Sequence, residues 1–201
     1  MIIGNLATAN RVAILVPGSD TTLATFFSRG PASPGGGAEA LAAEAHRLDP
    51  GEQLAIIAWL GYPAPAMLSP GVMTSGDAGQ GAQALRPLVT ALARHGDRVA
   101  LLCHSYGSVV CGLAAPHLPV TDIAVFGSPG MDASSVASLH TRARVWAGRE
   151  RGDSIRLRAS QTAEIVAKAL DVKVVVDARL AEPLDLEVIA SILVETGRAA
   201  R

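Results

Sequence analysis

One serine in this sequence lies where a nucleophile would be expected. Ser105 stands in CHSYG, close to the pattern GxSxG, between the apolar run 98–103 and the small-residue segment 107–115. In a sharp strand-to-helix turn the serine projects from the tip, with its hydroxyl near the helix N-terminus, and such a turn needs small neighbours. Gly107 meets that need, and Cys103 in place of the first glycine is a mild departure. The spacing therefore predicts a nucleophilic serine, with an ordinary turn serine as the alternative.

A turn after the first apolar run could serve the same chemistry. Pro17 and Gly18 follow the run 11–16, and a glycine there lets the backbone pass close to a reacting carbonyl. A backbone N–H aligned with a developing oxyanion typically stabilises the transition state by roughly 3 kcal/mol. The turn is therefore a candidate oxyanion site, and a plain strand-to-helix connection is the alternative.

The elements that would position these turns alternate along the chain. Short runs that are nearly all apolar fit strands buried on both faces, and the segments between them have helical patterns. This alternation predicts a three-layer α/β/α fold with a mostly parallel sheet, in one domain over residues 1–201. Ligands of such sheets bind at the carboxyl ends of the strands. The predicted strands are residues 11–16, 53–59, 98–103, 121–126, 144–147 and 173–176, and the predicted helices are 38–47, 83–94, 107–115, 159–170 and 186–195.

Two segments rich in proline and glycine interrupt this pattern. Residues 29–37 predict a flexible connector, because their glycines form neither GxxxxGK nor a strand-borne GxGxxG. Residues 61–81 follow the second predicted strand and exceed the usual loop length of about 4–6 residues. We expect a lid or substrate-facing loop there, to which Tyr62, Met67 and Met73 contribute apolar surface.

Composition disfavours several classes of function. With 17 Lys and Arg against 18 Asp and Glu, the formal net charge of −1 disfavours nucleic-acid binding. No apolar stretch reaches the roughly 18–20 residues of a membrane-spanning helix, and the N-terminus lacks signal-peptide features, so we expect a cytoplasmic protein. The two cysteines, Cys103 and Cys111, have no metal-ligand spacing. We therefore expect neither a disulfide nor a metal site.

The chain resembles the α/β-hydrolase superfamily, and within it a group of actinobacterial hydrolase-like domains. The similarity spans residues 4–155 and rests on the segments GNLATANRVAILVPGSDTT, AWLGYPAP, LLCHSYGSVV, AVFGSPGMD and VWAGRERGDSI. The resemblance implies a small α/β-hydrolase core, complete or truncated, with Ser105 as nucleophile and no cofactor. It also implies oxyanion donors at the backbone N–H groups of Tyr106 and Ser19.

In this superfamily an acid and a histidine base act with the serine as a catalytic triad. The sequence matches these two residues less well than it matches the serine. Asp153 follows the strand predicted over 144–147, where the superfamily commonly carries the acid that orients a histidine, and Asp132 is the second candidate. A solvated aspartate and a helix N-cap are the respective alternatives. The superfamily order is serine, acid, histidine, yet no histidine follows His140, so the expected base is missing. We expect His104 to pack beside the nucleophile. The remaining histidines are expected at helix ends or before a strand: His46, His95, His117 and His140.

The segment 158–201 differs from the end expected for that superfamily. The segment 158–195 resembles a helix–strand–helix piece of the histidine phosphatases, in which RAxQTA, here RASQTA at 158–163, places an arginine near phosphate. Those enzymes need an RHG after a strand, and the RHG at 94–96 follows a predicted helix instead. Phosphatase machinery is therefore not expected. We divide the domain into a family-like core, 1–157, and an atypical tail.

Together these features predict a serine hydrolase-like protein that cleaves a small carboxylic ester or another acyl substrate, with activity impaired by the missing base. The alternative is a non-catalytic binding or interaction module on the same scaffold. Neither nucleic acid nor a membrane span is expected. A homo-oligomer stays open, because a strand edge at residue 11 could be covered by a second copy.

Overall fold

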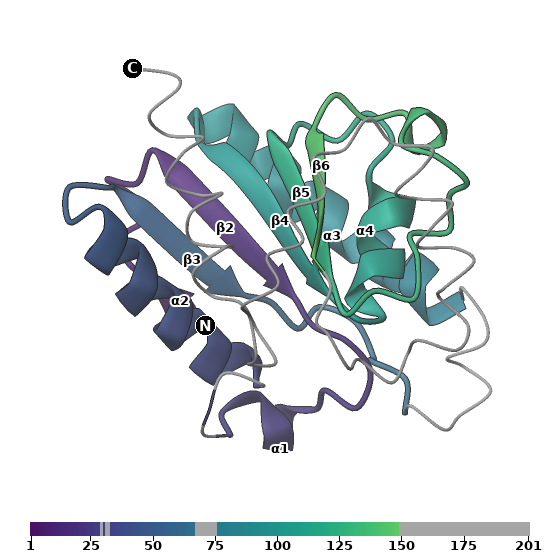
Figure 1. The fold of residues 1–201 in the computed structure, drawn as a ribbon, viewed down its shortest axis with the longest axis horizontal. Helices are drawn as coiled ribbons and strands as arrows, with labels where there is room; N and C mark the ends of the chain where they lie inside the picture. Colours follow the sequence, from purple (N-terminus) through teal and green to yellow (C-terminus); the bar gives the residue numbers. More distant parts are fainter. Residues whose placement is uncertain (29, 31–32, 67–75, 149–201) are drawn as a thin grey trace.

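The fold is built on a six-stranded sheet with the strand order β1-β3-β2-β4-β5-β6 (Figure 1). The computed structural model describes residues 1–28, 30, 33–66 and 76–148. β1 is antiparallel to β3, and all other neighbouring strands are parallel, so the predicted mostly parallel sheet is confirmed. The strands are β1 (Ile2–Ile3), β2 (Arg11–Val16), β3 (Leu54–Ala58), β4 (Arg98–His104), β5 (Asp122–Phe126) and β6 (Arg144–Gly148).

Helices cover both faces of the sheet, which confirms the three-layer α/β/α prediction (Figure 1). One hydrophobic cluster lies beneath α2, and a second lies beneath α3 and α4. Successive residues of β2 point into different clusters: Ile14 packs in the one beneath α3 and α4, and Leu15 in the one beneath α2. Burial on both faces explains why the strands are nearly all apolar between their ends. The longer helices are α2 (Pro34–Leu48), α3 (Gly76–His95) and α4 (Gly107–Ala114).

β2 lies inside the sheet and not at its edge. It pairs with β3 on one side and with β4 on the other, and Arg11 itself has a partner in each. The expectation of an open strand edge at residue 11 is therefore wrong. The reason is that sheet order differs from chain order: β3 comes later in the sequence yet covers this side of β2, and β1 in turn pairs with β3.

The helices α2 and α3 begin earlier than the sequence pattern predicts, whereas α4 begins at the predicted residue. α2 starts at Pro34, so the glycines 35–37 are helical and do not form a flexible connector. The Ser33 hydroxyl caps this helix by accepting the Gly36 N–H at 3.1 Å, and proline is favoured in the first turn. α3 starts at Gly76 instead of 83, which shortens the loop expected over 61–81.

Three short elements have no counterpart in the sequence prediction, because two to four residues carry too little periodicity to be read. They are β1, the helix α1 (Leu23–Phe26) and the 3-10 helix Ala137–Leu139. The elements predicted over 159–170, 173–176 and 186–195 lie outside the described residues. Within the described ranges, no helix combines the length and apolarity needed to cross a membrane.

A substitution in α4 tests how closely this helix packs. A Cβ added to Gly112 would overlap the carbonyl oxygen of Met131, in the segment after β5. Because that oxygen belongs to the backbone, we expect Gly112→Ala to lower the free energy of unfolding by about 1–3 kcal/mol, measured by chemical denaturation. Gly79→Ala in α3 is the matched control, since no atom lies within 4 Å of its added Cβ. The control should be neutral or stabilising by up to about 1 kcal/mol, because alanine favours helix over glycine. Equal effects of the two substitutions would contradict this packing.

Candidate active site

Ser105 forms the tip of the turn between β4 and α4, as predicted. Its φ of 49° lies in the left-handed region, which costs a residue other than glycine about 1–3 kcal/mol and persists only where its surroundings hold it there. Neighbouring groups do so: the Ser105 N–H donates to the Phe126 carbonyl at 3.0 Å, and the Ser108 N–H donates to the Ser105 carbonyl at 2.9 Å. The buried Ser108 hydroxyl also donates to the Cys103 carbonyl at 3.2 Å. Hydrogen bonds to α4 and β5 therefore hold Ser105 in this conformation, and a further one connects α4 to β4.

Two glycines let the end of β2 approach this turn. A Cβ on Gly18 would lie 2.7 Å from the Ser105 Cβ and 3.2 Å from its Oγ. A Cβ on Gly107 would overlap the carbonyl oxygen of Val16. Both positions therefore need glycine for close approach, and the segment from Pro17 onward lies directly beside the serine hydroxyl.

The structure brings the two expected oxyanion donors to this same place. Tyr106 is the N-cap residue of α4, so its N–H lies in the first turn after Ser105. Ser19 directly follows Gly18 and is half-buried. Within the described part of the chain, no acceptor takes the Ser19 N–H. Their role as donors to an oxyanion stays a prediction.

Tyr62 holds the segment after β2 that contains the candidate oxyanion donor. Its side chain is buried, and its hydroxyl donates to the Pro17 carbonyl at 2.7 Å. The ring stacks between Trp59 and Tyr106, with centroids 5.9 and 6.4 Å away. Burial, reinforced by Tyr106 and Asp77, raises the pKa of the Tyr62 hydroxyl far above its ordinary value, so it stays a donor. Sequence reasoning missed this role; a contact of Tyr62 with substrate stays a prediction.

Tyr106 completes the link to the helix on the same face. It is 3% exposed, and its hydroxyl accepts the Ala78 N–H of α3 at 3.2 Å. Burial raises the pKa of this hydroxyl as well, and the Ala78 bond partly opposes that effect. Tyr106, which we expect to act through its backbone N–H, thus also connects α3 to the Ser105 turn through its side chain.

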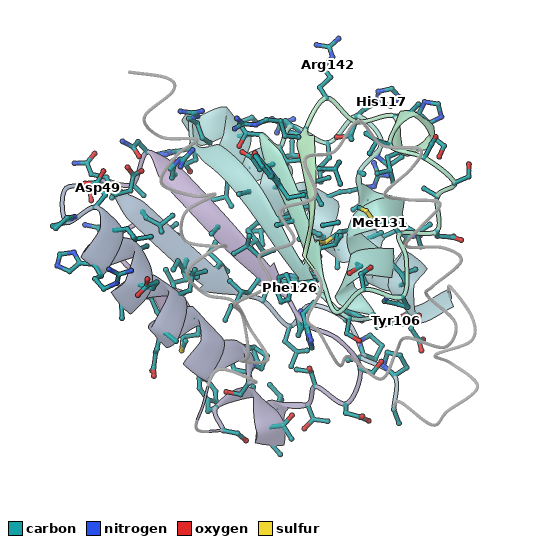
Figure 2. All side chains as sticks on the ribbon, in the orientation of Figure 1. Asp49, Tyr106, His117, Phe126, Met131 and Arg142 are labelled. Carbon is teal, nitrogen blue, oxygen red and sulfur yellow. A yellow bond between two sulfur atoms is a disulfide. The ribbon has the colours of Figure 1, made fainter. Side chains whose placement is uncertain are left out.

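All five histidines lie within the described residues. None of them hydrogen bonds the Ser105 hydroxyl. His104 is half-buried and stacks on the Phe126 ring at a centroid distance of 5.4 Å, and its expected packing against the nucleophile stays a prediction. Figure 2 shows Tyr106 and Phe126 at the carboxyl-end edge of the sheet and His117 at the opposite edge. The other four histidines are exposed, at the ends of α2 and α3, after α4 and before β6: His46, His95, His117 and His140.

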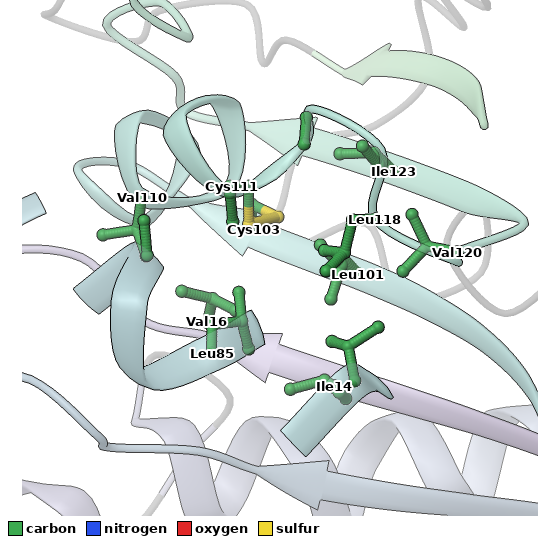
Figure 3. Packing of buried hydrophobic residues seen from close by; sticks show 14 of the residues in the cluster. Ile14, Val16, Leu85, Leu101, Cys103, Val110, Cys111, Leu118, Val120 and Ile123 are labelled. Atoms are coloured by element: carbon green, nitrogen blue, oxygen red, sulfur yellow. A yellow bond between two sulfur atoms is a disulfide. The ribbon is translucent and has the colours of Figure 1, made fainter. Parts of the chain in front are cut away.

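Cys103 and Cys111 form a disulfide, so the expectation that they remain unpaired is wrong (Figure 3). The strand and the helix fold back on each other around the serine turn, which brings the two Cα atoms to 6.5 Å. A sequence separation of 8 carries no recognisable spacing, and no local pattern indicated the pair. Disulfides are rare in cytosolic proteins, and the cytoplasmic location stays a prediction.

Several predicted residues lie outside the described part of the chain: Asp153, Met67, Met73 and the tail 158–201. Their roles stay predictions, as does the resemblance of the tail to histidine phosphatases. Asp132 is described; it is exposed, follows β5 and has a φ of 54°. The described residues contain no group of three or more His, Cys, Asp or Glu side chains that could hold a metal ion.

Comparison with solved structures shows the same architecture. Esterase PE8 superposes with a TM-score of 0.62 at 13% identity, covering 97% of each chain. The Trichoderma reesei cutinase, in complex with a phosphonate inhibitor, gives 0.55 at 15% identity over 92% of this chain and 75% of that one. A putative α/β-superfamily hydrolase of Xanthomonas campestris gives 0.54 at 19% identity over 94% and 99%. At these identities the likeness establishes the fold alone.

Comparison with protein sequences goes further. Two Mycobacterium tuberculosis proteins, uncharacterized protein MT2140 of strain CDC 1551 and uncharacterized protein Rv2079 of strain H37Rv, are each 34% identical over 164 residues. These alignments cover 77% of this chain but 24% of the relatives, so the chain spans about a quarter of their length. The model of the family described as alpha/beta hydrolase matches residues 1–163. With the sheet order and the strand–turn–helix around Ser105, this match shows that the chain belongs to the α/β-hydrolase family.

Proposed function

We propose that the chain is a serine hydrolase-type protein that acts on a small carboxylic ester or related acyl substrate through Ser105. The observation that carries this proposal is the left-handed conformation of Ser105 at the tip of the β4–α4 turn. A strained residue that its surroundings hold in place is typical of functional sites. Esterase PE8 and the cutinase share this fold, which supports a carbonyl substrate.

The proposed reaction uses the groups gathered at the carboxyl-end edge. The Ser105 Oγ attacks the carbonyl carbon, and its proton passes to a base. The N–H groups of Tyr106 and Ser19 would donate to the oxygen of the carbonyl as it becomes negative. Because no imidazole is bonded to Ser105 among the described residues, water takes the serine proton as the base and returns one to the ester's alcohol as it leaves. A second water then releases the acid from the acyl-serine. Gly18 serves this scheme because its lack of a Cβ keeps the oxyanion turn beside the hydroxyl.

The missing base sets the expected rate. With no imidazole bonded to Ser105 among the described residues, the hydroxyl stays protonated near neutral pH. Loss of one triad member typically removes several orders of magnitude of rate and leaves the contribution of the oxyanion donors. Asp153 remains the proposed acid. We therefore expect weak activity.

The position of the histidines favours a second candidate function. Because the four exposed histidines lie at helix ends or at the opposite edge of the sheet, the fold is also compatible with a non-catalytic binding module. Such a module would use the same edge to hold an acyl compound without cleaving it. The two functions differ in whether Ser105 forms a covalent bond.

Labelling with a fluorophosphonate separates them. The phosphorus of this probe accepts a serine oxygen and loses fluoride, so a reactive Ser105 becomes covalently labelled. We expect slow labelling of the native chain and none of Ser105→Ala, detected by mass spectrometry. Ser138→Ala is the matched control, because Ser138 is exposed, lies in the 3-10 helix Ala137–Leu139 and takes no part in the turn around Ser105, so this variant should label at the native rate. Absence of labelling in the native chain would favour the binding module.

A second prediction concerns the contact between the two turns. In Gly18→Ala the new methyl group lies within 3.2 Å of the serine hydroxyl and closer still to its Cβ, so one turn must move. We expect labelling of Ser105 to slow by about tenfold or more, because small displacements of reacting groups cost large factors in rate. Gly79→Ala, which meets no atom within 4 Å, should label at the native rate. Native labelling of Gly18→Ala would remove the oxyanion turn from the proposed mechanism.

A further inference from the structure

The Cys103–Cys111 disulfide encloses the candidate nucleophile. Cys103 lies on β4, two residues before Ser105, and Cys111 lies on α4, six residues after it. Both cysteines are fully buried, in the cluster beneath α3 and α4 (Figure 3). The covalent bond therefore closes a short loop whose tip is Ser105.

The short span of this loop limits what the bond can do. A disulfide that joins distant segments restricts a large part of the unfolded chain, whereas this one spans a separation of 8 residues. The strand and the helix it joins are already adjacent in sequence and connected through the Ser108 hydroxyl and the Cys103 carbonyl. Its mechanical effect is therefore concentrated on the turn itself.

The turn is also where restraint is needed. Ser105 has a φ of 49°, and its immediate restraints are two backbone hydrogen bonds, to Phe126 and from Ser108. If α4 shifts away from β4, the bond from the Ser108 N–H to the Ser105 carbonyl and the left-handed conformation are lost together. A covalent tie from the strand to the second turn of α4 opposes that movement.

We infer that the Cys103–Cys111 disulfide is a positioning element of this site: it holds the strand before Ser105 and the helix after it at the separation that keeps the serine at the tip of its turn. The inference rests on the proposed function for its chemical consequence, but its structural part concerns the turn alone. In this role both cysteines act through Ser105 and neither touches the substrate. Opening the bond requires a thiol reductant, which supplies two electrons and two protons and becomes oxidised to its own disulfide while two cysteine thiols form.

The first measurement establishes the bond in the purified chain. Denatured protein is treated with iodoacetamide with and without prior reduction, and the added mass is measured. We expect both cysteines to be alkylated after reduction and neither to be alkylated before it. Alkylation of both without reduction would overturn the inference.

The decisive experiment compares Cys103→Ala/Cys111→Ala with the native chain. At a temperature well below the unfolding midpoint of each protein, we expect fluorophosphonate labelling of Ser105 to slow by about tenfold or more. We also expect the Ser105 and Ser108 amides to exchange with solvent about tenfold faster relative to the amides of β2, because the turn opens locally. Val89→Ala, which removes buried volume in α3 and leaves the turn intact, is the control for lost stability.

The control separates positioning from general stabilisation. Val89→Ala should lower the unfolding midpoint while keeping the labelling rate and the relative amide exchange within about twofold of native. If the double-alanine variant behaves in the same way, the bond only stabilises the fold and the inference is wrong. If the native chain shows no labelling at all, the proposed function fails, and the exchange of the Ser105 and Ser108 amides alone decides whether the bond positions the turn.

Discussion

The close approach of the β4–α4 turn to the end of β2 is the constraint on which the site depends. Neither Gly18 nor Gly107 has room for a Cβ, because the first faces the side chain of Ser105 and the second faces the backbone of Val16. Because these two glycines have no side chain, the strained serine and the candidate oxyanion turn can lie in direct contact. Gly107 is therefore required by the neighbouring strand as well as by the turn in which it stands.

The parallel sheet supplies the rest of the support. β4 lies between β2 and β5, with Cys103 beside Val16 on one side and His104 beside Phe126 on the other. Because parallel strands end at the same edge, the carbonyl of Phe126 is in place to accept the Ser105 N–H. Tyr62 reaches the same edge from the segment after β3 and holds the Pro17 carbonyl. The segments after β2 and β3 and the end of β5 thus converge on one turn.

The features predicted from sequence are those determined locally. Ser105 and its turn were identifiable because an apolar run, a serine and small residues are contiguous, and β2 was identifiable because every residue after Arg11 in it is apolar. The interior position of β2 could not be read, because it depends on which later strand pairs with it. The disulfide and the hydroxyl bond of Tyr62 likewise depend on segments brought together by the fold, and neither leaves a spacing pattern in the sequence.

The two proposed functions share the serine, its turn and the candidate donors, and they differ in the proton acceptor. A nucleophile needs its proton removed as the carbonyl is attacked, and an oxyanion site alone lowers the barrier without performing that transfer. His104 is beside Ser105 in sequence, yet its ring stacks on Phe126. Alternation along a strand sends successive side chains to opposite faces, and the sharp turn separates the two side chains further. The residue next to the nucleophile in sequence is therefore poorly placed as its base, and the location of a proton acceptor, more than the quality of the serine turn, determines whether this member of the family turns over a substrate.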